Sequence, residues 1–318
     1  MLEDKVQNVT VLLPTYNSGE YIKYAINSIL NQTFREFELL IIDDGSTDNT
    51  IEIIKQFDDK RIIYKKIEHS GISCALNYGL AISRYEWIIR MDADDISLPD
   101  RLKVQIEFLN HHRKYSVISS WYTMFGSKKV SHFFKLPISN EKIIKRLSLH
   151  SSLCHPGSLI KKKVITDVGG YRNTPFEDYD LWLRLKNKVL FYNIPEVLIL
   201  VRNKKDSLLR KSCAKSNQIL HLQRKYFSEK DEAIVDNNLN GWREWFYGNK
   251  KEARRLWLGG KYKNLFNYRI LLAILLSLFP IEYFEIIKRL NLKARMDYIF
   301  LFKRKDKKRL NAFISNQK

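Results

Sequence analysis

The sequence predicts an α/β fold in which helices flank a mainly parallel, doubly wound sheet, followed by a basic helical region. Through the first hundred residues, short apolar runs alternate strictly with amphipathic stretches, an order that favours parallel strands joined by right-handed crossover helices. After Arg202 the pattern changes to helices with Lys and Arg on their polar faces. The 318 residues allow one large domain and an appended region, which we place at residues 1–210 and 211–318.

Hydrophobic periodicity defines the individual elements. Buried apolar runs predict strands over residues 9–13, 37–42, 61–67, 87–91, 117–125, 157–160 and 197–201. Apolar residues at helical spacing predict helices over residues 20–30, 49–57, 72–82, 99–111 and 141–149, and from 177 through 185. Ligands of such sheets bind beyond the carboxyl ends of the strands, so the segments that follow each strand are the candidate site.

Composition narrows the functional classes. Apolar residues make up 45% of the chain, and 12 Gly and 7 Pro are too few for a fibrous or largely disordered protein. The net charge is +20, of which residues 202–318 contribute +17, and this asymmetry indicates an anionic partner such as nucleic acid or an acidic membrane. Three dispersed cysteines without a Cys-x-x-Cys pair, and a start unlike a signal peptide, predict a cytoplasmic protein.

An acidic segment, Met91-Asp92-Ala93-Asp94-Asp95, follows the fourth predicted strand. Residues two apart in an extended chain face the same side, so Asp92 and Asp94 can direct both carboxylates at one point. Such oxygen ligands suit Mg²⁺ or Mn²⁺, which a nucleotide's phosphates would share. The alternative is an acidic turn in which Asp95 or Ser97 caps the following helix.

Two further polar segments follow the first and second strands. Pro14-Thr15-Tyr16-Asn17 offers an aromatic ring on which a base can stack, although Tyr16 would equally suit the core. In Asp43-Asp44-Gly45-Ser46-Thr47-Asp48, a carboxylate can accept the ring N–H of a pyrimidine. Gly45 permits a tight turn there, and Ser46 to Asp48 have the composition of a helix cap.

A fourth segment, Phe176-Glu177-Asp178-Tyr179-Asp180, begins a predicted helix. Carboxylates in a first turn are favoured by the helix dipole, so capping explains them without any catalytic role. The same environment keeps a carboxylate ionised near neutral pH, as a general base requires.

In their order and spacing, the four segments resemble the family 2 glycosyltransferases, inverting enzymes with the GT-A fold, many of which build bacterial surface polysaccharides. The resemblance spans about residues 6–207. It implies transfer of a sugar from a nucleotide diphosphate donor, a UDP-sugar, to a hydroxyl of a growing glycan, with Mn²⁺ or Mg²⁺ as cofactor.

The resemblance also implies residue roles on the donor side. Tyr16 would stack on uracil and Asp44 would accept the N–H of the base, with Pro14, Thr15 and Asn17 alongside. Arg202 matches a motif that contacts the diphosphate.

At the reaction centre the resemblance implies that Asp92 and Asp94 bind the metal, and Asp92 the nucleotide as well. Asp178 would be the general base, with Glu177 orienting the acceptor. His155 would line the acceptor side or serve as a structural histidine, and Asp180 is the next candidate for the base.

The chain departs from this family's pattern at two places. Many relatives carry Arg where Ala75-Leu76-Asn77 stands, and His soon after the equivalent of Arg202, where Asn203 and Lys204 follow. Compensation of the diphosphate's charge would then rest on the metal, Arg90 and Arg202.

Two other functions fit less well. A sugar-phosphate nucleotidylyltransferase would open with a Gly-rich phosphate loop, and Pro14–Asn17 occupies that place. A nucleic-acid-binding protein would suit the charge, but the acidic clusters would repel phosphate and the basic excess avoids the predicted sheet. We therefore expect no nucleic-acid partner.

The basic region suggests attachment to a membrane surface. The apolar run 270–281, as a helix of about 18 Å, is too short for a hydrocarbon core of about 30 Å. Interfacial aromatics and cations surround it: Tyr262, Phe266, Tyr268, Phe279, Lys288, Arg289, Lys293, Arg295 and residues 303–309. We expect a peripheral protein on the inner face of the cell membrane, held by anionic lipid near a lipid-linked glycan acceptor. The alternative is a helix buried against the catalytic domain.

Overall fold

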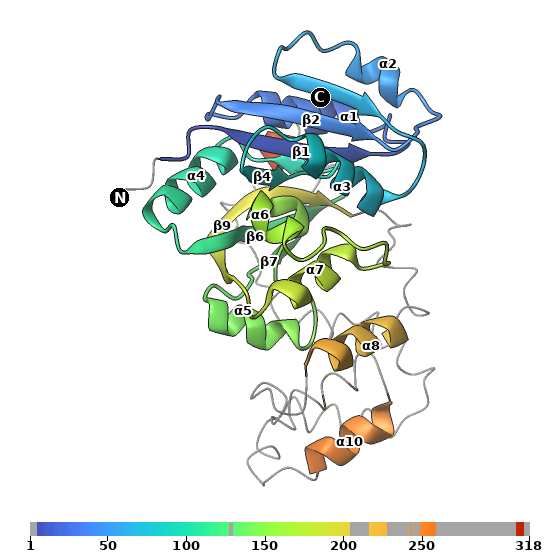
Figure 1. Ribbon diagram of the computed structural model, residues 1–318, viewed down its shortest axis with the longest axis vertical. Coiled ribbons are helices and arrows are strands. Elements are labelled where there is room, and N and C mark those ends of the chain that lie inside the picture. The colour runs from blue at the N-terminus through green and yellow to red at the C-terminus, as the bar shows by residue number, and fades with distance from the viewer. Residues whose placement is uncertain are drawn as a thin grey trace. The chain divides into compact units, whose positions relative to one another are not determined.

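A computed structural model describes residues 5–126, 130–203, 216–227, 249–258 and 310–314, together with residues 241 and 244. The chain divides into two compact units, residues 1–143, 152–204 and 300–318 in the first and residues 144–151 and 205–299 in the second. A single sheet with helices packed on it forms the first unit (Figure 1). Residues 310–314 belong to this unit, although the sequence analysis places them in the separate basic region.

Four parallel strands form one half of the sheet, in the order β3-β2-β1-β4. The strands are β1 (Val9–Thr15), β2 (Phe37–Asp43), β3 (Ile62–Lys66) and β4 (Trp87–Arg90). The connecting helices are α1 (Ile22–Leu30), α2 (Thr50–Ile54) and α3 (Ile72–Ile82). Every residue of β1 and β2 is buried, because helices cover both faces of a parallel sheet. This half has the predicted doubly wound arrangement.

The other half of the sheet is mixed and continues in the order β8-β6-β9-β5, with β7 beside β6. Its strands are β5 (Ile96–Ser97), β6 (Tyr115–Phe125), β7 (Val130–Phe134), β8 (Leu159–Lys161) and β9 (Leu190–Arg202). β6 and β9 are parallel, whereas β5, β7 and β8 each pair antiparallel to their neighbours. The sequence analysis predicted only the end of β9 and neither β5 nor β7. Two-residue β5 is too short to show any periodicity.

Further helices complete the first unit and the described part of the second. In the first unit these are α4 (Arg101–His111), a 3₁₀ turn (His155–Gly157), α6 (Lys162–Thr166) and α7 (Glu177–Leu185). Helix α5 (Asn140–Leu147) begins in the first unit and ends within residues 144–151 of the second. The 3₁₀ turn occupies the start of the strand predicted at 157–160, so β8 begins at Leu159.

The second unit contains α8 (Ser216–Tyr226) and α10 (Lys250–Leu258). Gln223 of α8 is buried and donates to the Leu149 carbonyl at 2.7 Å, and Trp257 of α10 is fully buried. The predicted membrane-binding run 270–281 and the cations that follow it lie outside the described residues. Among the helices that are described, none combines the length and hydrophobicity needed to cross a bilayer.

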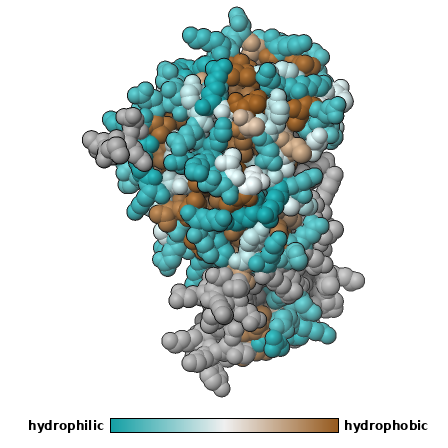
Figure 2. Space-filling view, viewed as in Figure 1, coloured by the Kyte–Doolittle hydropathy of each residue, from teal (hydrophilic) through white to brown (hydrophobic). Residues whose placement is uncertain are grey.

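A continuous apolar core holds the first half of the sheet together. Fully buried residues of β1, β2 and β4 pack against α1 and α4, including Val11, Ile26, Leu39, Ile89 and Leu102. Hydrophilic side chains cover much of the visible face, with hydrophobic patches between them (Figure 2). The buried strands leave their carboxyl ends as the polar edge of the sheet, where the candidate site lies.

Candidate active site

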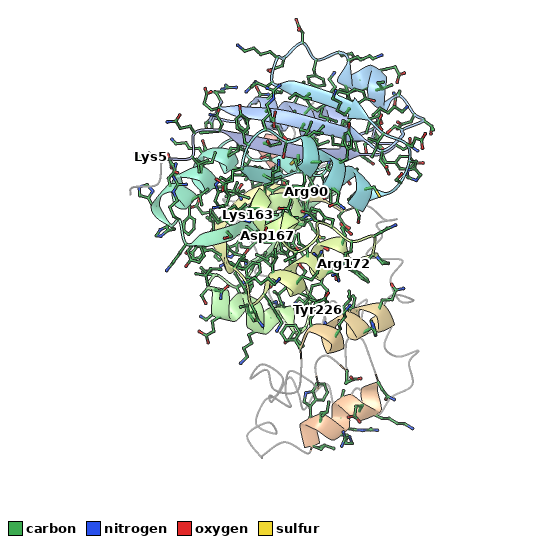
Figure 3. All side chains as sticks on the ribbon, viewed as in Figure 1. Lys5, Arg90, Lys163, Asp167, Arg172 and Tyr226 are labelled. Atoms are coloured by element: carbon green, nitrogen blue, oxygen red, sulfur yellow. The ribbon has the colours of Figure 1, made fainter. Side chains whose placement is uncertain are left out.

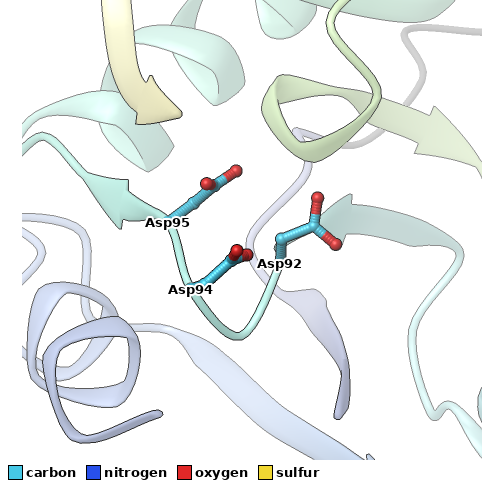
Figure 4. A group of neighbouring side chains, drawn as sticks. All are labelled: Asp92, Asp94 and Asp95. Atoms are coloured by element: carbon cyan, nitrogen blue, oxygen red, sulfur yellow. The ribbon is translucent and has the colours of Figure 1, made fainter. Parts of the chain in front are cut away.

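Three carboxylates gather in the turn between β4 and β5, which we call the acidic turn (Asp92–Asp95). One carboxylate oxygen from each of Asp92, Asp94 and Asp95 lies within 4.8 Å of the other two (Figure 4). The Asp95 side chain is buried, and its Oδ2 has no hydrogen-bond partner among the described residues. Burial and the neighbouring carboxylates of Asp94 and Asp92 hold the pKa of Asp95 well above its usual range.

The capping alternative for Asp95 and Ser97 is wrong. Helix α4 begins at Arg101, with Asp100 in the N-cap position. Ser97 instead lies in β5, and its hydroxyl accepts a hydrogen bond from Gln32 at 3.1 Å. Asp95 belongs to the acidic turn, so this site holds one carboxylate more than the sequence analysis assigned to it.

Buried polar side chains fix the acidic turn from below. The Gln32 amide donates to the carbonyls of Ser28 and Leu98, and its oxygen accepts the Leu102 N–H at 3.1 Å. Arg101, which is fully buried, donates to the Arg90 carbonyl at 2.7 Å. These bonds tie α1, the end of β4 and the start of α4 to one another around the turn.

Arg90 connects the acidic turn to the interior (labelled in Figure 3). Its Nη2 lies 2.7 Å from Asp92 Oδ1, and its side chain is only 2% exposed. Its Nε and Nη1 have no hydrogen-bond partner within the described part of the chain. Arg90 thus offsets the charge of Asp92 from inside the protein.

Arg202, at the end of β9, braces the same turn. Its backbone N–H donates to Asp95 Oδ1 at 2.8 Å, and its Nε donates to the Asp94 carbonyl at 2.8 Å. The guanidinium lies over the rings of Tyr21 at 4.3 Å and Phe125 at 4.4 Å. Since Nε is already bonded, a phosphate would have to be contacted by the two terminal nitrogens.

Tyr16 and Asp44 meet at the ends of β1 and β2 through a residue that the sequence analysis missed. Tyr16 is 44% exposed, so it is not a core residue, and it stacks on His69 with ring centroids 4.1 Å apart. His69 Nδ1 lies 2.9 Å from Asp44 Oδ2. His69 follows β3, so its place at the same sheet edge was the available signal.

The Asp44 carboxylate is held by backbone groups of the loop after β3. Ser70 N–H donates to Oδ1 at 2.8 Å and Gly71 N–H donates to Oδ2 at 2.9 Å. Gly45, directly after Asp44, has φ +78°, and a Cβ there would lie 2.9 Å from the backbone nitrogen of His69. Only glycine fits this turn without strain.

Asn17 joins the loops after β1 and β2. Its N–H donates to Ser46 Oγ, and its side-chain oxygen accepts the N–H groups of Thr47 and Asp48. Asp48 Oδ1 in turn accepts the N–H of Thr50, the first residue of α2, at 3.0 Å, whereas the N-cap position is Asn49 and so lies just after the predicted Ser46 to Asp48.

Pro14 and Thr15 form the end of β1 beneath this loop. Thr15 is buried, and its hydroxyl has no hydrogen-bond partner in the described ranges. Both residues are buried and directly precede the exposed Tyr16.

Glu177 and Asp178 begin α7 within electrostatic reach of the acidic turn. Burial raises the pKa of Asp178, the Tyr179 N–H and Arg90 lower it, and Asp92 raises it. Burial and the adjacent Asp178 raise the pKa of Glu177 to about 7. One carboxylate of this pair can therefore hold a proton near neutral pH while the other accepts one.

Asp180 and His155 have structural roles. Asp180 is buried and pairs with Arg184 at 2.7 Å, so it is not the alternative base. His155 Nε2 is hydrogen-bonded to the Tyr171 hydroxyl at 2.9 Å, and burial holds its pKa well below the usual value. Asn77, part of the segment that departs from the family's pattern, bonds both the N–H and the carbonyl of Tyr171.

Comparisons with known proteins agree with this architecture. The family model "Glycosyl transferase family 2" matches residues 10–169. The chain is 32% identical to "Putative glycosyltransferase EpsE" of Bacillus subtilis over 64% of this chain and 76% of that protein. It is 34% identical to "O-antigen biosynthesis glycosyltransferase WbnJ" of Escherichia coli over 60% and 78%, respectively.

Two solved structures share the fold. S. aureus TarS 1–349, in complex with UDP-GlcNAc, superimposes with a TM-score of 0.60 at 20% identity, covering 81% of this chain and 77% of that one. The mannosyltransferase PcManGT from Pyrobaculum calidifontis, in complex with GDP-Man and Mn²⁺, has a TM-score of 0.56 at 16% identity, covering 85% and 80%. With the family match, these likenesses establish that the chain belongs to glycosyl transferase family 2 and is a glycosyltransferase with the GT-A fold.

Proposed function

We propose that the protein transfers a sugar from a UDP-sugar to a hydroxyl of a growing surface glycan. The observation that carries the proposal is the meeting of the exposed Tyr16 ring, the Asp44 carboxylate and the acidic turn at one edge of the sheet. The relatives support it, because one is named for O-antigen biosynthesis and a protein of the same fold was solved with UDP-GlcNAc.

The donor's base would stack on Tyr16, whose ring is already supported by His69 on one side. Asp44 Oδ1 accepts one hydrogen bond, from Ser70, in the part of the chain that is described, and a carboxylate oxygen can accept a second. The N–H of uracil would supply it. The terminal nitrogens of Arg202 would contact the diphosphate.

The acidic turn suits a hard divalent cation. Three carboxylates lie close together, and the buried Oδ2 of Asp95 lacks a partner among the described groups, which a cation would supply. Asp92 and Asp94 would hold Mn²⁺ or Mg²⁺. The bound cation would neutralise the charge that develops on the departing diphosphate.

Asp178 would remove the proton from the acceptor hydroxyl as that oxygen attacks the anomeric carbon. The bond to the diphosphate breaks in the same displacement, so the configuration inverts. Glu177 would hold the acceptor hydroxyl in place. Burial raises the pKa of Asp178, which makes its carboxylate a stronger proton acceptor and supports the assignment.

The acceptor would be a glycan or a lipid-linked glycan, met by a cytoplasmic enzyme held peripherally on the anionic inner face of the membrane. The charge of +17 over residues 202–318 supports this attachment. The test is flotation with anionic vesicles, which compares the wild type with a variant in which Gln replaces four cations together: Lys288, Arg289, Lys293 and Arg295. Binding of the wild type to the vesicles should weaken as the salt concentration rises, and the variant should bind more weakly still. Full-length protein that does not bind anionic vesicles at low salt would contradict attachment.

Binding and turnover test the donor and metal assignments together. We expect UDP to bind tightly only with Mn²⁺ or Mg²⁺, and duplex DNA not to compete. Asp94→Asn should abolish metal-dependent binding and turnover, whereas Asp100→Asn, which neutralises an exposed carboxylate outside the acidic turn, should preserve both. Full activity of Asp94→Asn, or of the wild type in excess chelator, would overturn the metal assignment.

A further inference from the structure

The C-terminal helical residues 310–314, drawn in red in Figure 1, pack on side chains of the mixed half of the sheet, whose strand β5 directly follows the acidic turn. Ile314 is 8% exposed and belongs to one buried apolar cluster with Ile96, Phe125, Val130 and Leu200. Leu310 and Phe313 pack against the same cluster. Asn311 adds a polar contact, because its Oδ1 accepts the Val130 N–H at 3.0 Å.

The residues under this helix are direct neighbours of the site. Ile96 follows Asp95 in the chain and pairs with Leu200 in the β5–β9 ladder. Phe125 pairs with Arg202 in the β6–β9 ladder, and its ring lies 4.4 Å from the Arg202 guanidinium. Two members of the cluster that Ile314 joins, Ile96 and Phe125, are therefore direct neighbours of Asp95 and Arg202.

β5 depends on side-chain packing more than the longer strands do. It has two residues, both paired to β9, so its backbone ladder is short. The Ile96 side chain is 2% exposed, in the cluster that Ile314 joins. Removing Ile314 would loosen the strand that fixes the end of the acidic turn.

We propose that residues 310–314 are a positioning element of the active site, which holds β5 and the end of β9 so that Asp95 and Arg202 keep their places. Ile314 and Asn311 are its positioning residues, and the chain's last described segment is thus part of the sugar-transfer unit. The inference rests on the proposed function only where Mn²⁺ and UDP serve as probes.

The test compares two full-length variants of one helix. Ile314→Asp places a charge in the buried cluster, whereas Ala312→Asp places the same charge at an exposed position of that helix. We expect Ile314→Asp to weaken Mn²⁺-dependent UDP binding about tenfold and Ala312→Asp to leave it within about twofold. Ile314→Ala should weaken UDP binding less than Ile314→Asp does, and Ile314→Val should bind UDP as tightly as the wild type.

Amide hydrogen exchange provides a second reading without metal or nucleotide. In Ile314→Ala the amides of Ile96 and Arg202 should exchange faster, whereas those of Val11 and Leu39 should not change. Should Ile314→Asp fail to fold, Ile314→Ala decides the question. Unchanged exchange and unchanged UDP affinity in folded Ile314→Ala would overturn the inference. A wild type that fails to bind UDP would contradict the proposed function alone, because the exchange reading remains.

Discussion

Two regions at the same edge of the sheet differ in the surroundings of their carboxylates. One is the pair of loops that would hold the base, and the other is the centre that would carry out the transfer. In the base-side loops, Asp43 accepts hydrogen bonds from the Ser46 N–H and the Tyr64 hydroxyl, and two backbone N–H groups donate to Asp44. The chain itself therefore satisfies these groups.

At the centre, carboxylates lie close to one another. The pKa values of Asp95, Glu177 and Asp178 are all raised, with burial as the largest cause. Among the contacts described, Arg90 forms an ion pair with only one carboxylate of the acidic turn, that of Asp92 at 2.7 Å. The difference indicates that the chain itself supplies hydrogen-bond donors to the base-side carboxylates, whereas burial disfavours the charged forms of Asp95, Glu177 and Asp178, an effect that the proposed cation would oppose.

Removing the base should give the largest effect. Asp178→Asn retains the size of the side chain but cannot take a proton, so turnover should fall by roughly 10²- to 10⁴-fold. Affinity for UDP, measured by calorimetry, should stay within about twofold. Asp180→Asn is the contrast: it breaks the buried pair with Arg184, so it should lower the melting temperature. Loss of UDP affinity in Asp178→Asn would make that residue a donor ligand instead.

Arg202 tests how firmly the acidic turn is braced. Arg202→Lys retains the charge but loses both the bond from Nε to the Asp94 carbonyl and the planar stack on two rings. The ratio kcat/KM should fall about 10- to 100-fold. Arg172→Lys, which changes a half-exposed arginine outside the turn, should have little effect. Equal losses in both variants would mean that Arg202 has no special place.

A smaller effect should follow from changing the base-side loops. His69→Ala removes the ring that supports Tyr16, a contact of about 1 kcal/mol, so KM for the donor should rise about fivefold with kcat unchanged. His111→Ala, an exposed histidine on α4, is the control. A fall in kcat rather than a rise in KM would show that His69 acts beyond the base.

The last prediction concerns the free energy of unfolding and its dependence on pH, and it expects no change in donor affinity. Burial and Asp178 raise the folded-state pKa of Glu177 from 4.5 to about 7, so the native protein loses stability as pH rises between these values. Glu177→Gln removes this loss. In urea titrations with chelator, the variant should match wild type at pH 4 and gain about 3 kcal/mol at pH 8. An equal gain at both pH values would contradict the raised pKa.

The sequence predicts the first half of the fold and the edge where the site lies, because parallel strands have strong apolar runs that all end at one edge. It does not separate Asp178 from Asp180, since both occupy the first turn of α7 and only packing shows that Asp180 faces Arg184. Nor does it reveal His69 or Ile314, whose contacts join segments far apart in the chain.

Gln32 has a consequence for the kinetics of binding. The hydrogen bonds of its side-chain amide tie α1 to β5 and to the chain that follows it, and Gln32 itself is fully buried. These bonds hold the chain that follows the acidic turn in place. If the turn captures a divalent cation as proposed, the rate of capture should depend on diffusion and on the negative potential of its carboxylates, so it should fall as ionic strength rises.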